Sequence, residues 1–178
     1  MNIPNTITFV RILLIPVFIV FLLLPSQRYQ FAAGIIFAIV SFTDAVDGFI
    51  ARRQKTITSF GKFLDPIADK LLVTAALIFL IGKGVPAWMA FIIIAREFLI
   101  TGLRLSAQEK GKVIAASWLG KLKTITQMVA IFLVLIRFPF SYYFLLAAVI
   151  LTVISAIDYL AKLWPYLLEG KSPKQRGN

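Results

Sequence analysis

Six long apolar runs, separated by short polar or basic connections, dominate the pattern of this chain of 178 residues. Each run falls within the roughly 17–25 residues that an α-helix needs to cross the hydrocarbon core of a bilayer. The pattern therefore predicts an all-α, polytopic membrane protein with six transmembrane helices. We place these helices at residues 5–24, 31–50, 64–81, 86–106, 115–137 and 142–164, with ends defined to within several residues.

A single membrane domain over residues 1–168 accounts for all six runs, and we predict a polar, disordered cytoplasmic tail over residues 169–178. The first run has the length of a signal-peptide core. However, no basic residue precedes Arg11, and no small-x-small cleavage pattern follows the run. We therefore expect this run to remain as the first transmembrane helix.

The composition agrees with a membrane protein, since 60% of the residues are hydrophobic and the mean hydropathy is +0.88. A net charge of +11 first suggests nucleic acid. The basic residues interrupt the apolar runs and do not line one soluble face, so we expect no nucleic-acid partner. Membrane lipids and anionic substrates fit this charge better. The chain has no Cys or His, which leaves a carboxylate, ahead of Lys or Tyr, as the candidate general base.

The basic residues also predict how the helices are oriented. Of the 19 Lys and Arg residues, 15 fall on one side of the predicted membrane and three, Arg28, Lys83 and Arg137, on the other, while Arg11 lies within the first span. Basic residues collect in cytoplasmic loops. We therefore predict a multi-pass protein of the inner, cytoplasmic membrane, with both termini and its active site facing the cytoplasm.

Four of the eight acidic residues cluster between the second and third apolar runs. Asp44 and Asp47 are three residues apart, and Asp65 and Asp69 are four apart, so each pair shares one helix face. Carboxylates this close need a compensating charge, and carboxylate oxygens suit Mg²⁺ or Mn²⁺, with two ions per site as the expected number. The alternative is that all four are solvated at the membrane surface, but glycines in register on both helices favour a metal site.

The whole pattern, D-x2-D-G-x2-A-R-x8-G-x3-D-x3-D, runs from Asp44 to Asp69 and is matched at every position. It resembles the signature of the CDP-alcohol phosphotransferase family. Members of this family move a phosphatidyl or other phosphoalcohol group from a CDP-linked donor to an alcohol acceptor and release CMP. The sequence of residues 2–11 is similar to the branch of the family whose acceptor is sn-glycerol 3-phosphate.

The resemblance implies a metal-dependent phosphatidyltransferase of phospholipid biosynthesis, with CDP-diacylglycerol as donor and phosphatidylglycerophosphate and CMP as products. It implies Asp69 as the general base on the acceptor hydroxyl. The implied metal ligands are Asp44, Asp47, Asp65 and Asp69, and the implied contacts to the CDP moiety are Gly48, Arg52 and Thr58. Because relatives are typically homodimers, we expect a homodimer here.

Charged residues inside the fourth and fifth predicted spans are candidates for binding the acceptor's phosphate. Arg96 lies near the middle of its span, where an unpaired charge costs ~2.5 kcal/mol or more, and it shares a helix face with Arg104. Lys121 belongs to a polar stripe that we expect to line a cavity. We predict that Arg96, Arg104 and Lys121 bind the phosphate. The alternative for Arg96 is an ion pair with Glu97 or with an aspartate of the motif.

We expect the remaining charges near these spans to be structural. The stripe that contains the candidate phosphate ligand Lys121 also contains two uncharged residues, Ser117 and Thr124. We expect Lys123 to lie at the lipid headgroups and Lys70 to anchor its helix at the membrane surface. Asp158 and Lys162 are four residues apart in the favourable order and are predicted to form an ion pair.

Two kinds of rival function stay open. A sister enzyme would use the same metal site with another acceptor, of which inositol phosphate comes first, followed by phosphatidylglycerol or serine. A divalent-cation carrier would use the four carboxylates as a transport site. The carrier is the weaker rival, because the acids lie at the edge of the predicted membrane, whereas transporter sites lie near its midplane.

Overall fold

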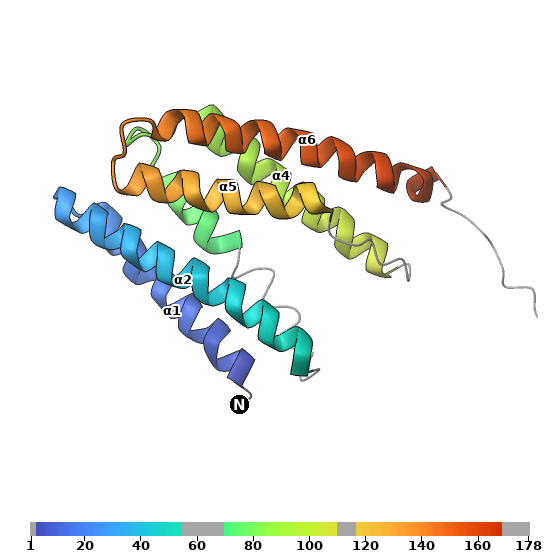
Figure 1. The fold of residues 1–178 in the computed structure, drawn as a ribbon, viewed down its shortest axis with the longest axis horizontal. Helices are drawn as coiled ribbons and strands as arrows, with labels where there is room; N and C mark the ends of the chain where they lie inside the picture. The colour runs from blue at the N-terminus through green and yellow to red at the C-terminus, as the bar shows by residue number, and fades with distance from the viewer. Residues whose placement is uncertain (1–2, 55–69, 110–116, 169–178) are drawn as a thin grey trace, which may run out of the picture.

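The computed structural model describes residues 3–54, 70–109 and 117–168, which form six helices (Figure 1). These are α1 (Ile3–Leu23), α2 (Gln27–Gln54), a helix at Lys70–Phe79, α4 (Ala87–Glu109), α5 (Trp118–Leu135) and α6 (Ser141–Leu168). The all-α prediction is confirmed, and every predicted span falls on one of these helices. The predicted tail and part of the third span lie outside the described residues.

The boundaries of these helices follow from local chemistry. Ser117 caps the start of α5, because its hydroxyl accepts a hydrogen bond from the backbone N–H of Gly120 at 3.1 Å. After the helix at Lys70–Phe79 the chain turns through Gly82 and Gly84, which have φ angles of +76° and +117°. These are left-handed conformations that glycine adopts without a steric penalty.

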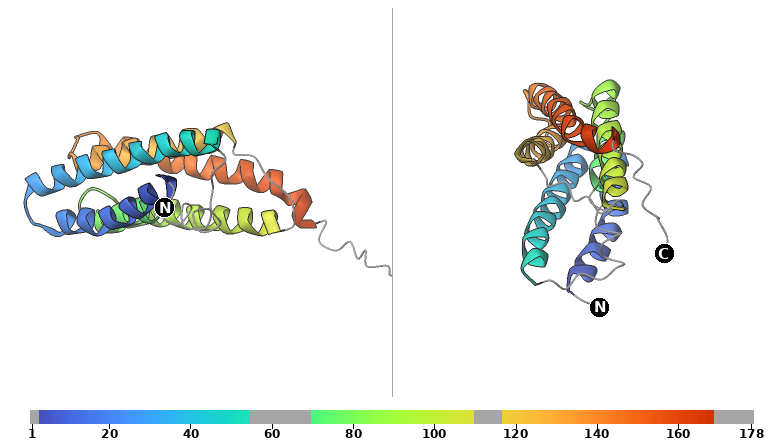
Figure 2. Two further views of the ribbon diagram at one scale, coloured as in Figure 1. Left: turned by 90° about the horizontal axis from the view of Figure 1, so that it is seen from below. Right: turned by 90° about the vertical axis from the view of Figure 1, so that its right-hand side faces the viewer.

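The helices pack as two groups. α1 packs against α2, while α6 packs against both α5 and α4, and a smaller α2–α5 contact joins the two groups. The groups meet at what we call the closed end, where the connections 80–86 and 136–140 lie. They separate toward the divergent end, where α2 ends and α5 begins (Figures 1 and 2). Both groups and the helix at Lys70–Phe79 contribute to one core, whose largest fully buried side chains include Phe18, Phe37, Leu77, Met89 and Ile131.

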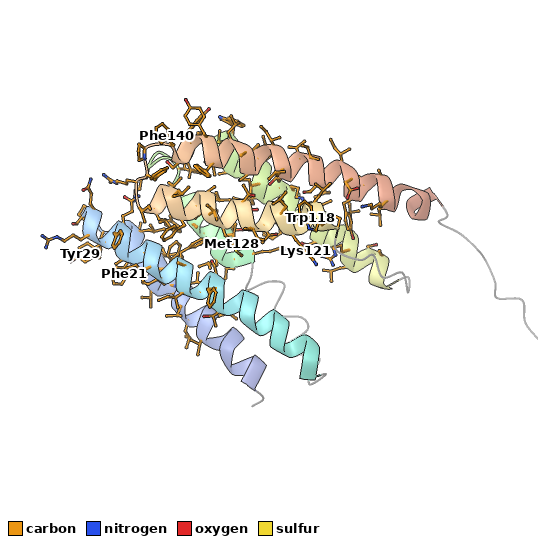
Figure 3. The ribbon with its side chains drawn as sticks, viewed as in Figure 1. Phe21, Tyr29, Trp118, Lys121, Met128 and Phe140 are labelled. Carbon is orange, nitrogen blue, oxygen red and sulfur yellow. The ribbon has the colours of Figure 1, made fainter. Side chains whose placement is uncertain are left out.

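The outer surface of the bundle is strongly apolar (Figure 3). Phe42, Phe91 and Trp118 are each 72% exposed, which a water-soluble surface of this size rarely shows. The segments Trp118–Leu135 and Ser141–Leu163 are long and apolar enough to cross a membrane. Ile12–Leu23, which is part of α1, and Lys70–Phe79 are shorter apolar helical segments. The protein is thus a membrane protein with lipid-compatible helices.

Candidate active site

The first half of the aspartate motif lies on the last turns of α2. Positions 44, 47, 48 and 52 all belong to this uninterrupted helix, which ends at Gln54. The prediction that one helix carries Asp44 and Asp47 three residues apart is therefore confirmed for the backbone. The side chains of residues 44–54 lie outside the described part, as do residues Thr58, Asp65 and Asp69 as a whole, so their predicted roles stay predictions.

A buried carboxylate at the middle of α4 is the centre of the polar interior that the structure describes. Glu97 is 9% exposed. Its Oε2 accepts a hydrogen bond from Lys70 Nζ at 3.2 Å, and its Oε1 accepts one from Lys123 Nζ. Arg96 Nη1 lies 3.6 Å from the same Oε1. We call Glu97, Lys70, Arg96 and Lys123 the Glu97 cluster; it joins α4 to α5 and to the helix at Lys70–Phe79.

The guanidinium of Arg96 is held from two sides. Besides its contact with Glu97, its Nη2 donates a hydrogen bond to Ser155 Oγ of α6 at 3.0 Å. The structural alternative for Arg96, a pair with Glu97, is therefore present. Within the described residues, the buried Nε of Arg96 has no hydrogen-bond partner. A buried N–H without an acceptor is unfavourable, so an acceptor oxygen placed beside Arg96 Nε would be stabilised there, and the ion pair does not exclude phosphate binding.

Arg104 lies two turns further along α4, and it is exposed. Ile100, between the two arginines, packs against Tyr159 of α6 in a small hydrophobic cluster. Arg96 also reaches α6, since its Nη2 donates to Ser155 Oγ. The face shared by Arg96, Ile100 and Arg104 therefore points toward α6.

The structure corrects the reading of the basic residues on α5. Lys121 is exposed and projects from the first turns of the helix (Figure 3). Lys123, expected at the lipid headgroups, is instead 3% exposed and bonded to Glu97. Gln127, one turn further along, is also 3% exposed. The buried polar positions of α5 are thus 123 and 127, and the side chain of Lys123 reaches Glu97 of α4.

Lys70 is also placed differently from expectation, since it pairs with Glu97 and does not serve only as a surface anchor. A signal for this cluster was present in the sequence. Glu97 is the only acidic residue between Asp69 and Glu109, and it lies in an apolar run. A lone buried carboxylate requires cationic partners, but the sequence does not say which of several basic residues supply them.

The surface of the bundle carries one predicted ion pair and two exposed tryptophans. Asp158 and Lys162 form the predicted ion pair, with Lys162 Nζ 2.8 Å from Asp158 Oδ2, on the exposed side of α6. Trp88 and Trp118 lie at the starts of α4 and α5 and are 49% and 72% exposed. This is where side chains of an interfacial aromatic belt are found.

The polar groups at the closed end differ in kind. Lys83 Nζ donates to the backbone carbonyl of Leu22 at 2.7 Å. Arg137 Nε donates to Gln30 Oε1 at 2.9 Å, and Gln30 Nε2 in turn donates to the carbonyl oxygen of Val134 at 3.5 Å. These bonds tie α1 and α2 to the ends of their neighbours.

A metal site is implied by the motif and fits the donor atoms available. Within residues 3–54, 70–109 and 117–168 no group of three or more acidic side chains forms a metal cage among those whose side chains are described. The four aspartates of the motif supply carboxylate oxygens, which are the ligands that Mg²⁺ and Mn²⁺ prefer.

Comparison with known proteins gives a consistent result. Residues 1–154 match the CDP-alcohol phosphatidyltransferase family. A Bacillus subtilis (strain 168) protein named CDP-diacylglycerol–glycerol-3-phosphate 3-phosphatidyltransferase is 44% identical, with 93% of this chain and 97% of the relative covered. Proteins of the same name are 40% identical in Pseudomonas fluorescens, covering 94% and 92%, and 45% identical in Escherichia coli (strain K12), covering 73% and 74%. The resemblance predicted from the motif is confirmed, and the chain belongs to the CDP-alcohol phosphatidyltransferase family.

Proposed function

We propose that this protein transfers the phosphatidyl group of CDP-diacylglycerol to sn-glycerol 3-phosphate, giving phosphatidylglycerophosphate and CMP. The observation that carries this proposal is the 44% identity over 93% of the chain to a relative of that name. The complete motif from Asp44 to Asp69 supports it independently, because the acidic positions and their spacing are all present.

Asp44, Asp47 and Asp65 would be the core ligands of two Mg²⁺ or Mn²⁺ ions, and Asp69 would be a further ligand. When bound, such ions supply positive charge that stabilises the negative charge on the oxygens of the transferring phosphoryl group. The family is generally metal-dependent, which agrees with this donor set.

The chain's own residues then position the reactants and move one proton. Asp69 accepts the proton of the acceptor hydroxyl. The hydroxyl oxygen forms a bond to the phosphorus of the phosphatidyl group while the bond from that phosphorus to CMP breaks. Gly48 allows the CDP moiety to approach the α2 backbone closely. Arg52 provides a guanidinium that fits a phosphate with two hydrogen bonds, and Thr58 adds a further contact.

The proposed site for the acceptor's phosphate is formed by Arg96, Arg104 and Lys121. Its best support is the buried Nε of Arg96, which has no hydrogen-bond partner among the described residues. Arg96 and Arg104 share the α4 face that points toward α6, so both are available to one anion. This arrangement favours a phosphorylated acceptor over serine, and it makes inositol phosphate the second candidate.

We also propose that all six helices cross the inner membrane, with both termini and the site on the cytoplasmic side. The exposed apolar side chains on the bundle surface support insertion, and the distribution of Lys and Arg supports the orientation. The acyl chains of CDP-diacylglycerol then stay in the bilayer while CMP leaves to the cytoplasm. The homodimer expected from the resemblance stays a prediction.

The test is CMP release by the purified protein with CDP-diacylglycerol and Mg²⁺, comparing glycerol 3-phosphate, inositol phosphate, inositol, serine and phosphatidylglycerol. We expect release with glycerol 3-phosphate alone. Release only with another acceptor would preserve the family chemistry and change the substrate. Metal uptake into proteoliposomes without CDP-diacylglycerol, together with no CMP release, would favour a cation carrier.

A further inference from the structure

Glu97 has no role in the proposed reaction, although it is buried and contacts three cations. We propose that Glu97 is a positioning residue: its carboxylate fixes the acceptor-phosphate site on α4 relative to the helix that follows the aspartate motif. This inference rests on the proposed function. It assigns Glu97 no contact with substrate and no proton transfer.

The geometry of the carboxylate supports this role, because both of its oxygens are used. Oε2 binds Lys70 Nζ at 3.2 Å, while Oε1 binds Lys123 Nζ and lies 3.6 Å from Arg96 Nη1. Lys70 begins the helix at Lys70–Phe79, and Lys123 lies on α5. One carboxylate thus sets the spacing of three helices near the divergent end.

On one side, Glu97 orients Arg96. The guanidinium is held between Glu97 and Ser155 Oγ, which it contacts at 3.0 Å. A guanidinium fixed at two edges presents its remaining N–H in one direction, so less freedom is lost when an acceptor binds. The direction of the free Arg96 Nε is therefore controlled by Glu97 and α6.

On the other side, Glu97 holds Lys70, which directly follows Asp69 in the chain. The contact with Glu97 holds the side chain of Lys70 and thereby the first turn of the helix at Lys70–Phe79. This turn directly follows the second half of the motif in the sequence. Glu97 therefore contacts both Arg96, the proposed phosphate ligand, and Lys70, the residue that follows the proposed general base in the sequence.

The charges of the cluster explain why a carboxylate is needed at this position. The side chains of Lys70, Arg96 and Lys123 are 17%, 12% and 4% exposed, and like charges this close repel one another when little water separates them. Glu97 offsets part of this repulsion, because its carboxylate contacts all three cations.

The test compares Glu97→Gln with the wild type, both as purified full-length chains assayed with CDP-diacylglycerol, Mg²⁺ and varied glycerol 3-phosphate. The amide keeps the shape but removes the charge that holds the three cations together. We expect the KM for glycerol 3-phosphate to rise about tenfold and kcat to fall, with the KM for CDP-diacylglycerol within about twofold. Glu97→Asp keeps the charge and should recover part of the loss.

Asp158→Asn is the matched control, since it also removes one carboxylate from an ion pair, but from the exposed pair with Lys162. Its kinetic constants should stay within about twofold of the wild type. Unchanged KM and kcat in Glu97→Gln, in a preparation whose wild type is active, would overturn the inference. An inactive wild type would instead refute the proposed function and with it this inference.

A second variant separates positioning from stability. Glu97→Gln combined with Lys123→Met removes both charges of the buried pair, and replacing such a pair with uncharged groups often restores stability. If Glu97 only stabilises the fold, a double variant with wild-type thermal midpoint should also regain its wild-type KM for glycerol 3-phosphate. A positioning role predicts that the thermal midpoint recovers while the KM stays raised.

Discussion

The closed and divergent ends of the helix bundle use basic side chains in different ways. At the closed end, Lys83 and Arg137 donate to neutral acceptors, the carbonyl of Leu22 and the amide of Gln30. Toward the divergent end, three cations surround one carboxylate, Glu97. Neutral acceptors satisfy hydrogen bonds at helix ends without gathering charge, whereas the Glu97 cluster concentrates positive charge.

The two ends also differ in the size of their apolar clusters. The large core reaches from the closed end through both groups of helices. Further along α4 and α6, a separate small cluster consists of Ile100, Ala107, Tyr159 and Leu163. The large core contains most of the closely packed apolar side chains, and such packing is what holds helices together in a bilayer. The divergent end can therefore hold charged groups for chemistry because the closed end secures the fold.

Removing the metal should have the largest effect on activity, and it tests whether the divergent end carries the chemistry. With excess chelator we expect CMP release to stop, because the four aspartates of the motif then lack the cations that stabilise the phosphoryl oxygens. Adding Mg²⁺ or Mn²⁺ back should restore release. Full activity in chelator would show that the divergent end does not work through a metal site.

The next effect is expected from Asp69→Asn. Removing a general base lowers turnover by about 10²–10⁴-fold, while binding of CDP-diacylglycerol should remain measurable. The experiment measures kcat by CMP release and donor binding by equilibrium titration of the same preparation. Near-normal turnover would show that Asp69 is not the general base, and another carboxylate would then be the candidate.

A smaller effect is expected from Arg96→Ala. Loss of a charge-assisted hydrogen bond of about 1.5–3 kcal/mol predicts a KM for glycerol 3-phosphate raised roughly tenfold to a hundredfold. Ser155→Ala is a graded comparison, because it keeps the guanidinium and removes one of its two internal partners. It should raise this KM by less than Arg96→Ala does. An unaltered KM in a folded Arg96→Ala protein would return Arg96 to a purely structural role.

The smallest effect on catalysis, and a clear effect on stability, is expected at the closed end. Gln30 is 6% exposed and bonds both Arg137 and the carbonyl of Val134. Gln30→Ala leaves these groups without their partner and should lower the free energy of unfolding by about 1–3 kcal/mol. The KM for glycerol 3-phosphate should not change. A raised KM would show that the two ends are coupled more strongly than their packing indicates.

The sequence predicted the helices well because their signal is local. An apolar run of the right length specifies a helix whatever its neighbours are, and over the residues that the structure describes each of the six runs falls on a helix. It also placed Asp44 and Asp47 on one helix, since spacing along a helix depends on the backbone alone. The pair Asp158–Lys162 was predicted for the same reason, as both partners lie on one helix four residues apart.

The predictions for Lys123 and Lys70 were wrong or incomplete, because the partner of each lies on another helix. Lys123 was expected at the lipid headgroups and Lys70 at the membrane surface, yet both bond Glu97. No pattern within one segment indicates which residue of another helix will face it. The sequence predicts that the stripe at Lys121 lines a cavity, and it does not indicate that the buried polar positions of α5 are Lys123 and Gln127.

By itself the sequence determined the helical class, the family and the order of the aspartate motif, because these depend on hydropathy and spacing along the chain. Only the tertiary structure decided that Lys123 is buried and Lys121 exposed. The two residues are two positions apart, about 200° around a helix, so either could have faced the interior. The packing of α5 against its neighbours selected Lys123, and thereby assembled the Glu97 cluster from three separate segments of the chain.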